Sequence, residues 1–304
     1  MHLNNTDAMK TIALLRSMRL PFLVLTPVCV FLGASTVIAS QAAVNLYMLG
    51  LALAGALLAH ISVNTLNEYL DFRSGLDYMT TRTPFSGGSG ALPAHPEAAS
   101  TVVAVGIASL LASILLGMFF VWKYGFGIVP LGITGIALIV FYTGWINKSP
   151  YLCLIAPGAG FGFLMVAGTQ YVLEGHYNPL SWLIAVVPFF LVNNLLLLNQ
   201  YPDIQADARS GRNHFPIAYG IPASNRVYAV FVVATAISIV GYVITGQLPA
   251  MSLAALLPLP LAFFALGGAV RHGADIGQHP QYLAANTAVA ILSPLLLGLS
   301  VLTA

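Results

Sequence analysis

The sequence has 304 residues, of which 58% are hydrophobic and only 7% are charged, and its net charge is +2. A soluble domain carries about 25% charged residues, so this chain has too little charge to solvate its own surface in water. The composition predicts a membrane protein and excludes a soluble enzyme, a disordered chain, a disulfide-rich secreted domain and a nucleic-acid binder with a basic patch. Cys29 and Cys153 lie inside apolar runs and are interpreted as small buried hydrophobes.

Long apolar runs divide the chain into segments that can each cross a bilayer. A spanning helix needs about 20 mainly apolar residues. The first run has this length and follows a polar stretch that is unlike a cleaved signal peptide. In chain order we expect nine spans, near residues 20–40, 46–66, 98–122, 126–146, 151–173, 181–201, 224–246, 249–270 and 281–303. The prediction is an all-α, polytopic membrane protein in which residues 1–304 form one transmembrane domain.

The distribution of lysine and arginine predicts how the chain is oriented in the membrane. Cytoplasmic loops carry an excess of these residues. With a cytoplasmic N-terminus, that side holds Lys10, Arg16, Arg19, Arg73, Arg82, Lys148, Arg209, Arg212, Arg226 and Arg271. The other side then holds only Lys123. We therefore expect a multi-pass protein of a cytoplasmic or inner membrane, with its C-terminus on the side opposite to the N-terminus.

The first of two acidic motifs follows the second predicted span. Residues four apart share one face of a helix, so Asn67 and Asp71 point in the same direction. Gly75 is expected to end this helix, which lets Asp77 fold back toward Asp71. Glu68 lies off this face and is expected to matter less.

The second motif repeats the Asn-x-x-x-Asp spacing at the exit of the sixth predicted span. Helical spacing there brings Asn199, Asp203 and Asp207 to one face. Both motifs begin long connections, residues 67–97 and 202–223, on the predicted cytoplasmic side. The two sets of acidic side chains are therefore expected to meet at one end of the helix bundle.

The residue types in these motifs favour a magnesium and diphosphate site. Carboxylates held together repel one another unless a cation neutralises them. Oxygen ligands without Cys or His suit Mg²⁺, which binds through one or two carboxylates together with substrate phosphates. The candidate ligands are Asn67, Asp71, Asp77, Asn199, Asp203 and Asp207. Arg82 and Arg212 follow the two motifs and are candidates to hold a diphosphate, and Lys148 on the same side is a further candidate.

A glycine-rich stretch, residues 80–91, lies between the first motif and the third span. Such stretches are usually flexible linkers. The alternative is a lid that closes over a bound diphosphate. Phe85 would then cover the apolar mouth, and Gly87 and Gly88 would serve as hinges.

The two motifs resemble those of the UbiA superfamily of intramembrane prenyltransferases. The stretches Asn67-Glu-Tyr-Leu-Asp71-Phe-Arg-Ser-Gly75-Leu-Asp77 and Asp203-Ile-Gln-Ala-Asp207-Ala-Arg-Ser-Gly211-Arg212 are most similar to the MenA branch, which prenylates 1,4-dihydroxy-2-naphthoate. The resemblance implies a nine-helix bundle around a central cavity that is capped on the cytoplasmic side. It also implies Mg²⁺-dependent transfer of a polyprenyl group from its diphosphate to a small aromatic acceptor.

The resemblance assigns roles to individual residues. The expected catalytic residues are Asn67, Asp71 and Asp203, the expected diphosphate-binding residues are Arg82, Arg212 and Lys148, and those facing the prenyl group and acceptor are Asn64 and Tyr142. The sequence departs from the branch pattern at Glu68, Pro202 and His214. These departures keep the expected metal ligands and leave the acceptor open.

The rival interpretation is a transporter or ion-coupled carrier, in which acidic helix ends bind the transported cation. It predicts carboxylates near the middle of the membrane and access from both sides. The predicted outer half of this chain is nearly free of charge, which favours the enzyme.

Overall fold

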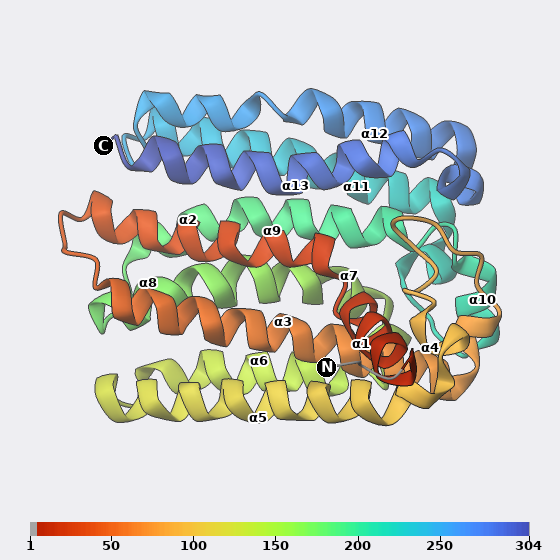
Figure 1. Cartoon of the computed structure of the whole chain (residues 1–304). Helices are drawn as coiled ribbons and strands as arrows, with labels where there is room; N and C mark the ends of the chain where they lie inside the picture. The colour runs from red at the N-terminus through yellow and green to blue at the C-terminus, as the bar shows by residue number, and fades with distance from the viewer. Residues whose placement is uncertain (1–4, 304) are drawn as a thin grey trace.

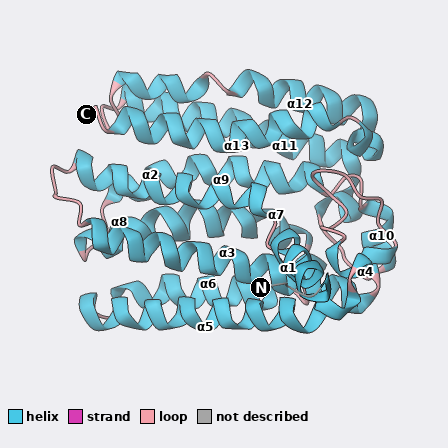
Figure 2. Cartoon of the chain, in the orientation of Figure 1, coloured by secondary structure: helices cyan, strands magenta, loops and turns pink. Residues whose placement is uncertain are grey.

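The computed structural model describes residues 5–303, which form a bundle of roughly parallel and antiparallel helices, and no strand occurs in this range (Figures 1 and 2). The helices are α1 (Asn5–Ser17), α2 (Leu25–Ala39), α3 (Leu46–Ser74), α4 (Ala91–Ala94), α5 (Ala99–Tyr124), α6 (Val129–Phe141), α7 (Pro150–Gly158), α8 (Gly168–Glu174), α9 (Pro179–Asn199), α10 (Ile204–Arg209), α11 (Phe215–Ile244), α12 (Leu259–His272) and α13 (Pro280–Val301). Shorter 3₁₀ segments and one π-helical segment, η6 (Ala159–Ala167), join several of them.

The predicted spans are confirmed as apolar helices in the described range. Eight helical segments are long and apolar enough to cross a membrane, and the ninth predicted span corresponds to a shorter apolar helix over Phe126–Phe141. α3 continues two turns past the apolar span predicted to end at residue 66 and stops at Ser74, as the predicted helix end at Gly75 requires. The first acidic motif therefore lies on a helix, because nothing in its sequence breaks the helix before Gly75.

The fifth span changes its helical type in the membrane. Pro157 in α7 has no backbone N–H to donate, and the side-chain oxygen of Asn193 on α9 accepts a hydrogen bond from the Gly158 N–H at 2.6 Å. The chain then continues as η6 before it returns to α-helical geometry in α8. π-Helical turns are rare and are found most often at functional sites, and this one turns Phe161 toward the interior of the bundle.

A buried polar cluster joins three helices that support the second motif. The Asn194 amide on α9 donates to the Tyr228 carbonyl of α11 at 3.0 Å, and the Tyr228 hydroxyl donates to Asn286 of α13 at 2.9 Å. Asn286 in turn donates to the Asn194 carbonyl at 3.0 Å. Within a bilayer such bonds hold helices together where the hydrophobic effect does not, so the end of α9 is fixed relative to α11 and α13.

We predict that two glycines of the fifth span, Gly158 and Gly162, are needed for packing. A Cβ on Gly158 would lie 2.1 Å from the Phe189 carbonyl oxygen, and one on Gly162 would lie 2.7 Å from the Ala185 carbonyl oxygen. Gly158→Ala and Gly162→Ala should each destabilise the protein by about 1–3 kcal/mol through overpacking, measured as a lower thermal unfolding midpoint in detergent. Gly160→Ala is the matched control, because its Cβ would meet only Leu138 at 3.9 Å. Equal effects at all three positions would contradict this explanation.

Candidate active site

A cavity of about 600 Å³ lies inside the bundle between α3, α5, α6, the fifth span and α9. Its lining on α3 extends from Ala52 to Asp71, which is about 28 Å along a helix. Apolar side chains line most of this length. Polar and charged side chains gather at one end, which is the end that carries α4 and α10 in Figure 1. The cavity is therefore suited to a ligand with a charged head and a long apolar tail.

The first motif approaches this end from α3. Asn67 and Asp71 line the cavity from one helix face, as their spacing predicts. The helix ends at Gly75, whose φ of 81° is in the left-handed region that glycine adopts without strain. The chain then folds back, so that Asp77 is 3% exposed and also lines the cavity. The predicted return of Asp77 is thus present in the structure.

The second motif approaches from the opposite side. Asn199 ends α9, Asp203 lies in the turn that follows, and Asp207 is buried on α10, so the single helix face predicted for these three residues is wrong because the turn interrupts the helix. All three line the same cavity as the first motif. The turn is anchored by Tyr201, which is fully buried and donates through its hydroxyl to Asn225 of α11 at 2.8 Å.

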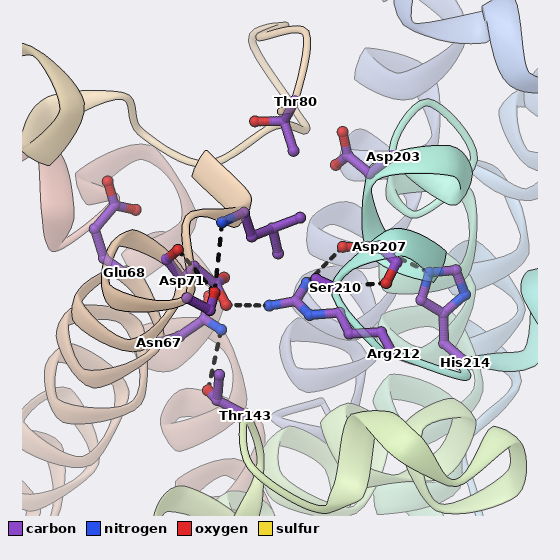
Figure 3. Close-up of polar contacts among 12 residues, drawn as sticks. Asn67, Glu68, Asp71, Thr80, Thr143, Asp203, Asp207, Ser210, Arg212 and His214 are labelled. Carbon is purple, nitrogen blue, oxygen red and sulfur yellow. Dashed lines mark hydrogen bonds and ion pairs between the residues drawn. The ribbon is translucent and has the colours of Figure 1, made fainter. Parts of the chain in front are cut away.

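Arg212 joins the two motifs. Its guanidinium group pairs with Asp71 of α3 on one side and with Asp207 at 2.9 Å on the other (Figure 3). A ring nitrogen of His214, Nε2, lies 2.9 Å from the second oxygen of Asp207. Arg212 is 19% exposed, so these charge-assisted contacts are shielded from most of the solvent.

The glycine-rich stretch folds over the mouth of the cavity. The Gly87 N–H donates to Asp203 at 2.8 Å, and both the backbone and the hydroxyl of Ser89 donate to Glu68. Phe85 lies on the cavity side and makes an edge-to-face contact with Phe22 at 6.4 Å. The stretch is therefore held on both sides of the mouth, as a lid requires. Its role in catalysis stays a prediction.

Glu68 and Arg19 form a pair that the sequence alone did not identify. Glu68 is fully buried although it points away from Arg212 (Figure 3), and it lies 3.7 Å from the Arg19 guanidinium group. Arg19 also donates to Asn67 at 3.4 Å and lines the cavity. Its φ of 53° is unusual for a residue with a side chain. Charge counting assigned Arg19 only to the cytoplasmic side, because no periodic pattern marks its contact with Asn67, which is 48 positions away.

The remaining predicted residues divide into two groups. Asn64 and Tyr142 line the cavity, and the Asn64 amide donates to the Met18 carbonyl at 3.0 Å. Arg82 and Lys148 are exposed and do not line the cavity. The Arg82 guanidinium group instead passes over Gly90 at the outer surface of the lid. The structure thus brings Arg19 and Arg212, and not Arg82 and Lys148, to the polar end.

The polar end fits a divalent cation in its donor chemistry. One side-chain oxygen each of Asp77, Asn199 and Asp203 is buried and has no hydrogen-bond partner in the described part of the chain. Uncompensated buried acceptors are costly, and hard oxygen donors of this kind suit Mg²⁺. Within residues 5–303, no three His, Cys, Asp or Glu side chains are close enough to enclose an ion by themselves. A bound ion would therefore draw further ligands from elsewhere, as Mg²⁺ does from substrate phosphates.

Burial changes the acidity of two of these carboxyl groups. It raises the pKa of Asp77 to about 7, with added repulsion from Glu68 and Asp71. Burial likewise raises the pKa of Asp203 to about 7, against the opposing hydrogen bond from Gly87. Both shifts show that these two carboxyl groups are removed from water, with nearby carboxylates adding to the effect, so that a bound cation would favour their charged forms.

Comparison with known proteins identifies the class of protein to which this helical bundle with two facing acidic motifs belongs. The UbiA prenyltransferase family matches residues 26–276, and the chain belongs to this family. It is 29% identical to the 1,4-dihydroxy-2-naphthoate octaprenyltransferase of Bacillus subtilis over 215 residues, or 70% of this chain and 68% of that protein. It is 27% identical to the Haemophilus influenzae protein of the same name over 217 residues, or 66% of this chain and 70% of that protein. The predicted family resemblance is confirmed.

Solved structures share this fold. A UbiA homologue from Archaeoglobus fulgidus, solved with DMAPP and Mg²⁺, matches with a TM-score of 0.65 at 13% identity over 95% of this chain and 99% of that chain. Digeranylgeranylglyceryl phosphate synthase matches with a TM-score of 0.62 at 13% identity, over 97% of this chain and 99% of that one. The predicted all-α fold is therefore confirmed.

The raised pKa values of Asp77 and Asp203 predict a pH-dependent stability. Because each pKa rises from 3.8 in the unfolded chain to about 7 in the fold, the fold favours the protonated carboxyl groups. Their stabilising contribution is complete below about pH 4 and is lost as the pH rises through 7. The unfolding midpoint in detergent with EDTA should thus fall by a few degrees between pH 5.5 and pH 8, and Asp77→Asn should reduce this fall. A midpoint that rises over this range, or that falls equally in Asp77→Asn, would contradict the assignment.

Proposed function

We propose that this prenyltransferase transfers a polyprenyl group from its diphosphate to a 1,4-dihydroxy-2-naphthoate-type acceptor, with Mg²⁺ as its cofactor. The observation that carries the proposal is the set of buried, unpartnered oxygens of Asp77, Asn199 and Asp203 at the charged end of a long apolar cavity. A cation with a diphosphate would satisfy these oxygens, and the apolar walls would receive the prenyl chain. The acceptor class is supported by the names of the two relatives.

The residues at the polar end would divide the work on the diphosphate. Asn67, Asp71, Asp77, Asn199, Asp203 and Asp207 are the proposed metal ligands. When bound, Mg²⁺ would act as a Lewis acid that stabilises the charge developing on the departing diphosphate. Arg19 and Arg212 would donate hydrogen bonds to the same charge from positions fixed before the substrate binds.

The apolar part of the cavity and the lid would protect the reaction from water. Loss of diphosphate leaves an allylic cation that water would capture, so the reacting carbon must lie in a dry environment. Phe85 and the backbone of Gly87 and Gly88 cover the mouth of the cavity. Tyr142 lies just inside it, where its ring could face the cation.

We further propose that the polar end faces the cytoplasm. Both motifs and the lid lie at one end of the bundle, whereas α13 ends at the other (Figure 1). The excess of lysine and arginine at the motif end favours the cytoplasmic side for it. The transporter alternative is not favoured, because the family is one of prenyltransferases and the carboxylates lie at a bundle end.

Removal of a carboxylate from either motif should abolish transfer. Asp71→Ala and Asp203→Ala are each expected to lower kcat by at least about a hundredfold, because loss of one ligand disables a shared cluster. The assay is incorporation of a labelled prenyl group into 1,4-dihydroxy-2-naphthoate by the purified protein in Mg²⁺. The double variant should be hardly worse than either single one. Asp275→Ala, at an exposed carboxylate, is the control, and robust Mg²⁺-dependent turnover by Asp71→Ala would refute the proposal.

Substitution of Arg19, which lines the cavity, and of Arg82, which is exposed, should have different effects on the KM for the prenyl diphosphate. Arg19→Gln is expected to raise the KM for the prenyl diphosphate about tenfold, since a charge-assisted hydrogen bond contributes about 1.5–3 kcal/mol. Arg82→Gln is the matched variant, and its KM should stay close to that of the wild-type protein because Arg82 is exposed. A larger effect at Arg82 would restore it as a diphosphate-binding residue in a more closed lid.

A further inference from the structure

Polar side chains continue along α3 from the carboxylates into the membrane. His60, Asn64, Asn67 and Asp71 are spaced by four, three and four residues, which places them on one face of the helix, and all four line the cavity. His60 lies seven residues before Asn67, or about 10 Å deeper along the helix. A histidine at this depth in a membrane is unusual and indicates a functional role.

The surroundings of His60 leave one of its ring nitrogens without a protein partner. Nδ1 lies 2.8 Å from the hydroxyl of Thr26 on α2. The ring of Phe161, on the π-helical segment, meets the imidazole edge-to-face at 4.8 Å. His60 is only 5% exposed, and in the described part of the chain its other nitrogen, Nε2, has no hydrogen-bond partner. His60 is thus nine-tenths buried and lines the cavity with one polar atom unpaired.

The contact with Thr26 determines which ring nitrogen carries the proton. The Thr26 side chain is fully buried, and within residues 5–303 its hydroxyl has no other partner than Nδ1. If Nδ1 carried the proton, the Thr26 hydroxyl hydrogen would be left unsatisfied in an apolar environment, at a cost. The arrangement that satisfies both groups has Thr26 donating to Nδ1. The neutral imidazole then carries its proton on Nε2, which becomes a hydrogen-bond donor for the cavity.

We propose that the His60 Nε2–H donates a hydrogen bond to an oxygen substituent of the aromatic acceptor and so sets which ring carbon faces the prenyl diphosphate. This inference rests on the proposed function. A prenyl chain has no hydrogen-bond acceptor, and the diphosphate is retained at the carboxylate end, so the acceptor is the ligand whose chemistry fits. The depth of His60 below Asn67 is comparable to the length of a fused two-ring acid. In this tautomer Nε2 has no free lone pair, so His60 binds the acceptor and does not remove its ring proton.

The test compares acceptors that differ in one oxygen substituent. The purified full chain is assayed with Mg²⁺, a labelled prenyl diphosphate, and one of four acceptors: 1,4-dihydroxy-2-naphthoate, 1-hydroxy-2-naphthoate, 4-hydroxy-2-naphthoate or 1,4-dihydroxynaphthalene. His60→Phe keeps the aromatic volume beside Phe161 but loses the donor, and His60→Gln keeps an amide N–H at a similar reach. His60→Phe should raise the KM for the dihydroxynaphthoate about tenfold, the effect of one buried hydrogen bond. The KM for the prenyl diphosphate should be unchanged, and His60→Gln should restore most of the loss.

The discrimination between acceptors decides the inference. The preference is the ratio of kcat/KM for the dihydroxynaphthoate to kcat/KM for an analogue. In His60→Phe this ratio should fall about tenfold for the analogue that lacks the contacted oxygen. The analogue for which it falls shows whether that oxygen belongs to a hydroxyl or to the carboxyl group. Thr26→Val removes the hydroxyl that keeps the proton on Nε2 of His60 and does not contact the acceptor, so it should weaken the same preference. It also provides the test if His60→Phe does not fold. Ser113→Ala, at another polar side chain of the cavity wall, should leave the preference unchanged.

Two results would overturn the inference in different ways. An equal loss with all four acceptors, or an unchanged preference in both His60→Phe and Thr26→Val, would show that His60 only supports helix packing. Transfer by the wild-type protein to none of the four acceptors would instead refute the proposed function, and this inference with it.

Discussion

Excess negative charge at one end of an apolar cavity is the constraint on which the site depends. Two helices deliver carboxylates from opposite sides, and Arg212 links them directly because it pairs with Asp71 and Asp207 at once. Five carboxylates surround this end, including Glu68, while Arg19 and Arg212 supply two positive charges. Like charges are held together only where a fold fixes them by other means. Here the hydrogen bonds between α9, α11 and α13 fix the end of α9 and so hold the carboxylates of the second motif in place. Packing far from the site therefore keeps the carboxylates together.

The excess of carboxylates also connects the glycine-rich lid to the proposed metal site. Asp203 accepts the Gly87 N–H, and it also retains a buried oxygen that no protein group satisfies. The carboxylate that holds the lid is therefore also a proposed metal ligand, so lid position and cation occupancy act on a single group. Glu68 holds the other side of the lid through Ser89. A carboxylate that helical spacing placed outside the main face thus has a defined place in the mouth of the cavity.

Much of the fold and part of the site were predictable from the sequence, for a physical reason. Apolar runs and four-residue spacings are local signals, so they located the spans, the shared face of Asn67 and Asp71, and the helix end at Gly75. Contacts between distant segments leave no such signal. Arg19 meets Asn67 through a left-handed turn, and Arg82 follows the first motif in sequence but points outward. An arginine that follows a motif in sequence therefore need not lie in the site. The packing of separate segments decides which arginines reach it.

The polar face of α3 has a consequence for which changes this span tolerates. Each residue turns an α-helix by about 100°, so one residue inserted between His60 and Asp71 would rotate everything on one side of it out of the cavity. Exchange of one apolar side chain for another on the lipid-facing side leaves that rotation unchanged. The lipid-facing residues of this segment can therefore be exchanged for other apolar residues, whereas the number of residues between His60 and Asp71 must stay the same. The register of a single helix, more than the identity of most of its residues, keeps the deep and shallow ends of the cavity aligned.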